Sequence, residues 1–165
     1  GPEAHLKLQS RATGKVDISD SVVVARTLEL AEGIDQLDVV NSTLNLGLRT
    51  EGDLIIDGAS NFDLGGSGLQ VAGDLYLDGT TEFTQNTGPI QIDGDLHLTG
   101  TASFIQEVGT LTVGGDISLA PNTRISCEST EEDRDCRIEI TGQNLLVSTG
   151  ATIDERGAGP VPGNH

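Results

Sequence analysis

A fixed period of 21 residues dominates the middle of this chain, over residues 52–114. Three consecutive units share Gly-Asp-Leu, an apolar residue two positions later, a Phe and a final apolar pair: GDLIIDGASNFDLGGSGLQVA, GDLYLDGTTEFTQNTGPIQID and GDLHLTGTASFIQEVGTLTVG. A constant period of this length indicates a repeat architecture, in which each unit buries its apolar face against its neighbours. The fold can therefore be derived from a single unit.

Each unit predicts three short strands. Apolar and polar residues alternate at two places, as at Leu54/Ile56 and Leu69/Val71, and a period of two is typical of a strand with one buried face. A large apolar residue stands between the pairs in the series Phe62, Phe83, Phe104 and Ile125. Turns this brief leave no room for a crossover helix, so we expect one coil of a parallel β-helix, with like residues stacked about 4.8 Å apart. An antiparallel meander is the alternative, but it does not require a constant frame.

The ladder extends on both sides of the three units. The pair Leu69/Val71 has earlier counterparts at Leu48/Thr50, Leu28/Leu30 and Leu6/Leu8, and a later one is expected at Ile138/Ile140. We therefore predict an all-β, right-handed parallel β-helix (β-solenoid) of about seven coils, with about 21 residues per coil, as a single domain over residues 1–157. The handedness follows from the usual rule for parallel crossovers. Residues 158–165 predict an irregular exit or linker.

The charge of the chain excludes several partners. The formal net charge is −17, and residues 51–123 hold eleven acidic residues and no Lys or Arg. Such a surface repels nucleic acid and anionic membranes, and no apolar run is long enough for a membrane span. Solubility is the plain reason for the acidity, while cations or a basic partner remain open.

Four aspartates fall at the same place on successive coils: Asp53, Asp74, Asp95 and Asp116. One interpretation is that each accepts hydrogen bonds from backbone N–H groups of its own turn, as Asp commonly does after Gly. The other is a row of Ca²⁺ sites, because Ca²⁺ prefers several oxygen ligands. No other cofactor is expected.

The segment CESTEEDRDC begins at Cys127 and ends at Cys136. Two cysteines without a nearby His are a poor metal site, so we predict a disulfide that closes residues 127–136 as a loop inserted in one coil. Such a bond indicates an oxidising compartment. The loop carries Glu131, Glu132 and Asp133, which are candidates for binding a cation or a partner.

No catalytic site is expected. A pair such as Asp74 and Asp95 can imitate the paired carboxylates of polysaccharide hydrolases, but these carboxylates recur in every coil and resemble scaffold. A polysaccharide-active enzyme therefore remains only an alternative. A sugar-binding surface commonly presents aromatic rings, and Tyr76 with His97 one coil later is the one such pair.

The motif GDLHLTG at residues 94–100, with Phe104 and GTLTVG at residues 109–114, resembles the repeats of secreted bacterial β-helical surface proteins. These are autotransporter passengers and filamentous-haemagglutinin-like adhesins, and GATIDERG at residues 150–157 is similar to their inter-repeat turns. The resemblance implies an extracellular or cell-surface stalk or adhesive module without catalysis. Its partners would be a surface ligand or adjoining domains of the same protein. A Ca²⁺-dependent or self-assembling module, joined end to end, is the alternative.

Overall fold

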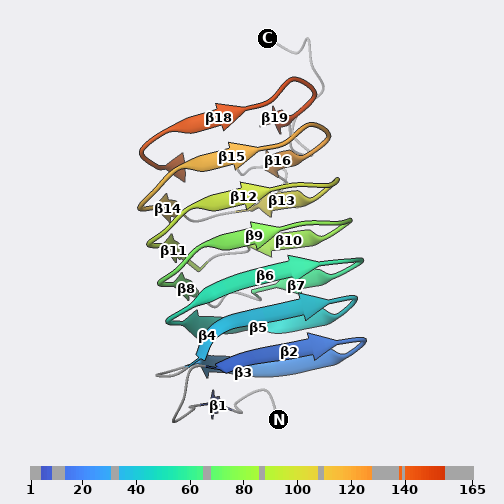
Figure 1. The fold of residues 1–165 in the computed structure, drawn as a ribbon, viewed down its shortest axis with the longest axis vertical. Helices are drawn as coiled ribbons and strands as arrows, with labels where there is room; N and C mark the ends of the chain where they lie inside the picture. The colour runs from blue at the N-terminus through green and yellow to red at the C-terminus, as the bar shows by residue number, and fades with distance from the viewer. Residues whose placement is uncertain are drawn as a thin grey trace.

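The computed structural model describes residues 5–8, 14–30, 34–64, 68–85, 88–107, 110–127, 138 and 140–154. In these ranges the chain is all-β, and its parallel strands stack into a β-solenoid of about five turns with about 21 residues per turn (Figure 1). The predicted all-β parallel solenoid and its period of about 21 residues are therefore confirmed. Within the same ranges, no helix has the length and apolarity needed to cross a membrane.

Each turn of the solenoid contributes to three faces. The first face is a seven-stranded parallel sheet, which lies in front in Figure 1. In spatial order its strands are β18 (Leu145–Val147), β15 (Ile117–Leu119), β12 (Leu96–Leu98), β9 (Leu75–Leu77), β6 (Asp53–Asp57), β4 (Ile34–Val40) and β2 (Gly14–Ser19).

The other two faces belong to one twelve-stranded sheet. The second face contains β7 (Asn61–Asp63), β10 (Glu82–Gln85), β13 (Ser103–Gln106), β16 (Arg124–Cys127) and β19 (Thr152–Asp154). The third face contains β1 (His5–Leu8), β8 (Leu69–Val71), β11 (Ile90–Ile92), β14 (Leu111–Val113) and β17 (Ile140–Thr141). The long strands β3 (Val22–Leu30) and β5 (Thr43–Thr50) pass through both faces, because β5 pairs with β7 at its start and with β8 at its end.

The core consists of the ladders that the alternation predicts. Leu54, Leu75 and Leu96 are in register on the first face, and all three are fully buried. On the second face Phe62 and Phe83 stack with ring centroids 5.0 Å apart, and Phe83 and Phe104 with centroids 5.2 Å apart. The pairing predicted upstream of the repeats is also confirmed in full, since β1, β3, β5 and β8 align with the expected partners.

The corner between the first and second faces has a left-handed backbone in successive coils. The residues concerned are Asp20 (φ 49°), Asn41 (48°), Gly58 (69°), Gly79 (67°), Gly100 (65°), Asn122 (68°) and Gly150 (92°). In the central coils these corners lie directly on one another. A Cβ atom on Gly79 would lie 2.6 Å from the carbonyl oxygen of Gly58, so glycine is required there both for its φ and for its size.

The interior also contains two hydrogen-bonded glutamines, Gln85 and Gln106, which are fully buried on the second face. Gln106 Nε2 donates to Gln85 Oε1 at 3.0 Å. Gln85 Nε2 in turn donates to the carbonyl oxygens of Gly88 at 2.7 Å and Thr110 at 3.0 Å. Buried carboxamides are tolerated here because their hydrogen-bonding groups find partners.

The sequence prediction was wrong about the register after the inserted loop. Ile140, not Ile138, pairs with Leu111, so the interval is 140 − 111 = 29 residues rather than the 27 expected. The two-residue difference keeps the same side of the strand inward, which is why the apolar alternation alone did not reveal it.

Candidate functional site

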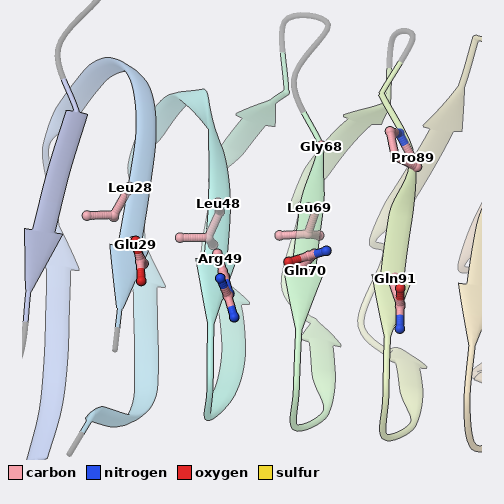
Figure 2. Close-up of a pocket in the computed structure, with 9 residues that line it drawn as sticks. All are labelled: Leu28, Glu29, Leu48, Arg49, Gly68, Leu69, Gln70, Pro89 and Gln91. Carbon is pink, nitrogen blue, oxygen red and sulfur yellow. The ribbon is translucent and has the colours of Figure 1, made fainter. Parts of the chain in front are cut away.

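The third face carries a row of polar side chains that project outward at the same strand position. Pairing places Glu29 beside Arg49, Arg49 beside Gln70, and Gln70 beside Gln91. Arg49, Gln70 and Gln91 each lie between two buried positions of their strand, so the alternation of the strand directs them to solvent. Figure 2 shows these four side chains on successive strands, on the same side of the sheet. The row therefore runs along the axis of the rod.

Two adjoining hollows lie along this row. The first, of about 330 Å³, is lined by Leu28, Glu29, Leu48, Arg49, Gly68, Leu69, Gln70, Pro89 and Gln91. The second, of about 410 Å³, is lined by Arg49, Thr50, Glu51, Gln70, Val71, Ala72, Gln91 and Asp93. Arg49, Gln70 and Gln91 line both. We call the two hollows together the axial groove.

Arg49 distinguishes the axial groove electrostatically. Among the basic side chains that the structure describes, Lys15 forms ion pairs with Asp17 at 3.1 Å and with Asp38. Arg124 Nη2 lies 3.8 Å from Asp154 Oδ2. Within the same described residues, Arg49 is exposed and forms no ion pair, so its guanidinium donors are available to a ligand.

The groove offers acceptors as well as donors. Glu29, Glu51 and Asp93 bring carboxylates to its lining, and Gln91 Nε2 donates to Asp93 Oδ1 at 3.0 Å. A guanidinium only donates, a carboxylate only accepts, and a carboxamide does both. This arrangement suits reversible hydrogen bonding to a polar ligand.

Sequence reasoning did not identify the axial groove. It noted that residues 51–123 lack Lys and Arg, and Arg49 lies just outside that range. The available signal was the residue enclosed by the second apolar pair of each unit, which is Arg49, Gln70, Gln91 and Thr112 in successive coils. Reading the outward residues along the ladder, and not only the inward ones, would have revealed the row.

The four predicted aspartates do stack at one corner of the rod, but their hydrogen bonds differ from the prediction. Asp74 N–H donates to Asp53 Oδ1 at 2.8 Å, Asp95 N–H to Asp74 Oδ1 at 2.7 Å, and Asp116 N–H to Asp95 Oδ1 at 2.8 Å. The carboxylates of Asp53, Asp74 and Asp95 therefore each accept a backbone N–H from the next coil rather than from their own turn. This is possible because identical turns bring each N–H onto the carboxylate of the turn before it.

Metal binding by Asp53, Asp74, Asp95 and Asp116 stays a prediction. Within the described ranges, no three His, Cys, Asp or Glu side chains gather as ligands for a metal ion. One oxygen of Asp53, Asp74 and Asp95 is used by the neighbouring coil. The row therefore has a structural role that does not depend on Ca²⁺.

Tyr76 and His97 stack on the first face, next to the aspartate row. Their ring centroids are 4.8 Å apart with an interplanar angle of 14°. Tyr76 Oη donates to Asp74 Oδ2 at 3.1 Å, and His97 Nε2 lies 3.9 Å from Asp95 Oδ2. Partial burial raises the pKa of the Tyr76 phenol above its ordinary value, and the hydrogen bond to Asp74 raises it further.

The inserted loop lies largely outside the described residues. Cys127 is described: it ends β16, is fully buried and is in register with Gln106. Cys136, Glu131, Glu132 and Asp133 lie outside the described ranges, as do residues 158–165. The disulfide, the binding loop and the exit segment stay predictions.

The fold and its corner ladders place this chain in the class of parallel β-solenoid repeat proteins. Comparison with known proteins finds no matching family model, curated protein or solved structure. Its function must therefore be inferred from its own residues.

Proposed function

We propose that this chain is a structural or adhesive β-solenoid module of a larger secreted or cell-surface protein, working without catalysis as a stiff spacer or binding surface. The observation that carries the proposal is the continuity of the pairing. On the first face every strand from β2 to β18 pairs in parallel with the next. At the corners, Gly73 N–H donates to Gly52 O at 3.2 Å, Gly94 N–H to Gly73 O at 3.0 Å, and Gly115 N–H to Gly94 O at 2.9 Å.

Bending such a rod would stretch hydrogen bonds on one of its sides, since the strands of all three faces and the corners on either side of the first face are joined between turns. A stack of this kind keeps a fixed length and a straight axis. Each turn contacts only its neighbours, so turns can be added or removed without changing the rest. These are the properties that a spacer requires.

The finer features of the proposal rest on supporting observations. A right-handed path agrees with the crossover rule, and about seven coils agree with the seven strands of the first face. The acidic charge favours a surface ligand or adjoining domains as partners over nucleic acid or membrane insertion. The cysteine pair favours an extracellular location.

The spacer function is tested by removing one turn. Deleting residues 73–93 joins Ala72 to Gly94 and preserves the frame of the repeat. Distance labels are attached through unnatural amino acids at Thr43 and Thr152, which are exposed and lie in one column of the second face. Pulsed dipolar spectroscopy should give one narrow distance that shortens by about 5 Å in the deletion variant. A broad distribution, or loss of folding on deletion, would reject a modular stiff rod.

The absence of catalysis is tested separately, by incubating the protein with neutral and uronate polysaccharides and measuring reducing ends. We expect no product. Product formation that is lost in Asp74→Asn would instead support the polysaccharide-active alternative.

A second candidate, end-to-end assembly, is favoured by the last described turn. Leu145 is 52% exposed and Val147 43%, although they continue the buried column of Ile117 and Leu119. β18 is also the last strand of the first face among the described residues. An uncovered apolar edge of this kind can pair with another copy of the chain. Light scattering should then show association that Leu145→Lys abolishes and that Val22→Lys, at a site 74% exposed on β3, leaves intact.

A further inference from the structure

We infer that the axial groove binds a neutral, hydroxyl-rich saccharide chain that lies along the rod. This inference rests on the proposed adhesive function and names the class of ligand. The first step is the mixture of hydrogen-bonding groups. Arg49 only donates, Glu51 only accepts, and Gln70 and Gln91 do both. A hydroxyl group is both donor and acceptor, so it can bond to every one of them.

Charge decides against ionic ligands. A polyanion would meet the carboxylates of Glu29, Glu51 and Asp93 in a chain whose formal charge is −17. A polycation would meet the unpaired Arg49 in the middle of the groove. Two of the carboxylates are also engaged within the protein, since Asp93 accepts from Gln91 and Glu29 has an interaction of its own. A neutral ligand avoids both penalties.

The spacing of the row favours a saccharide over a peptide. Arg49, Gln70 and Gln91 repeat once per coil, about every 4.8 Å. In an extended peptide, side chains on one side recur about every 6.6 Å, which is out of step with the coils. An extended chain of linked hexose rings advances per ring by a distance close to the coil spacing. Successive rings can therefore meet equivalent groups on successive coils.

The lining also suits the ring faces of sugars. Pro89 and Ala72 are exposed beside the carboxamides and offer apolar surface to the C–H groups of a ring. Both volumes lie within the usual range for small-ligand sites. The binding groups stand on paired strands, and the bond from Gln91 to Asp93 restrains one carboxamide. Little conformational freedom is therefore lost on binding.

The test is a titration followed by nuclear magnetic resonance of side-chain N–H groups. The probes are cellotetraose, mannotetraose and maltotetraose, with tetragalacturonate and tetralysine as the charged comparisons. We expect at least one neutral tetraose to shift the Arg49 Nε–H, Gln70 and Gln91 signals in a saturable way, and the charged probes to leave them unchanged. Arg49→Ala combined with Gln70→Ala should weaken binding about tenfold or more.

The matched control is Asn61→Ala. It removes an exposed carboxamide from the second face of the coil that contains Gln70, outside the lining of the axial groove, and should leave the affinity unchanged. Failure of all three neutral probes to shift the groove signals would overturn the inference. So would binding of a charged probe only, or shifts confined to Tyr76 and His97.

The distance measurement above separates this failure from that of the proposed function. A rod that keeps its single narrow distance but binds no saccharide overturns the ligand assignment alone. A broad distance distribution rejects the spacer function whichever probe binds.

Discussion

In the N-terminal coils, residues 14–50, the strands β2 to β5 run for six to nine residues, whereas in the central coils, residues 52–127, they run for three to five. The long strands contain register shifts, at Gly14/Lys15 and at Val24/Thr27. The short strands pair without shifts, and the corners before and after the first-face strands are hydrogen-bonded to the corresponding corners of the previous coil.

The two regions therefore hold their coils together by different means. The N-terminal coils use strand length, and their left-handed corners, Asp20 and Asn41, need not be glycine. The position that begins the aspartate row at Asp53 is held by Gln36 in the coil before. The central coils replace strand length with stacked glycines and aspartates. A sharply repeated sequence thus marks the region where stacked corners add to the pairing of short strands.

The largest effect should come from the aromatic column of the central coils. Phe83 is fully buried between Phe62 and Phe104, so Phe83→Ala should lower the free energy of unfolding by about 4 kcal/mol in urea titrations. Leu44 occupies the same column in the N-terminal region, and Leu44→Ala should cost about 3 kcal/mol. A greater loss for Leu44→Ala would reverse the comparison.

The corners should show the next largest effect. Gly79→Ala forces a Cβ against Gly58 at φ 67° and should cost about 2–4 kcal/mol of unfolding free energy. Asp20→Gly, at the equivalent corner of the N-terminal coils, should change it by less than about 1 kcal/mol. Equal losses in thermal melts of the two variants would mean that the corners are not what distinguishes the regions.

The aspartate row should contribute less. Asp74→Ala removes the acceptor of the Asp95 N–H and should destabilise by about 1.5 kcal/mol. Asp74→Asn keeps an acceptor and relieves like-charge repulsion of about 1 kcal/mol, so its melting midpoint should stay near that of the natural chain. A large rise in the midpoint of the natural chain with Ca²⁺, reversed by EDTA, would instead make the row a metal site.

The smallest effect concerns Tyr76, the only tyrosine in the chain, whose ionisation is visible in near-ultraviolet absorbance. Burial, and then the hydrogen bond to Asp74, raise its pKa above 10.0 in the folded state. The protonated phenol is thus favoured by folding. Its contribution to stability is full below pH 10 and is lost as the pH rises through the folded pKa. Asp74→Asn should lower this pKa. An unchanged titration curve would show that the charge of the aspartate row does not affect the pKa of Tyr76.

Most of the fold could be predicted from the sequence, because alternation and period together specify both strands and register. The column from Phe62 to Ile125 and the pairing of Leu6 with Leu28 and Leu48 were predicted residue by residue. The register at Ile140 was not predicted. It depends on the number of residues in the inserted loop, which the apolar alternation does not specify.

The candidate site was harder to predict, because its groups share a face only after winding. Arg49 and Gln91 are two coils apart in sequence yet line the same hollow. The aspartates were found, because they repeat without variation. Their partners were assigned to the wrong turn, since the sequence does not show that a corner lies directly on the one before it.

The buried pair of glutamines affects which of the near-identical turns pair with each other during folding. If the second face paired one turn out of step, Phe104 would still cover Phe62, and the hydrophobic core would not detect the error. The positions in register with the glutamines in adjacent turns are Leu64 and Cys127. A slipped chain would therefore place Gln106 against Leu64 and leave a carboxamide without its partner, at a cost of about 1–3 kcal/mol. Gln85 and Gln106 thus favour the correct pairing of two otherwise interchangeable turns. The rod therefore folds to a single length.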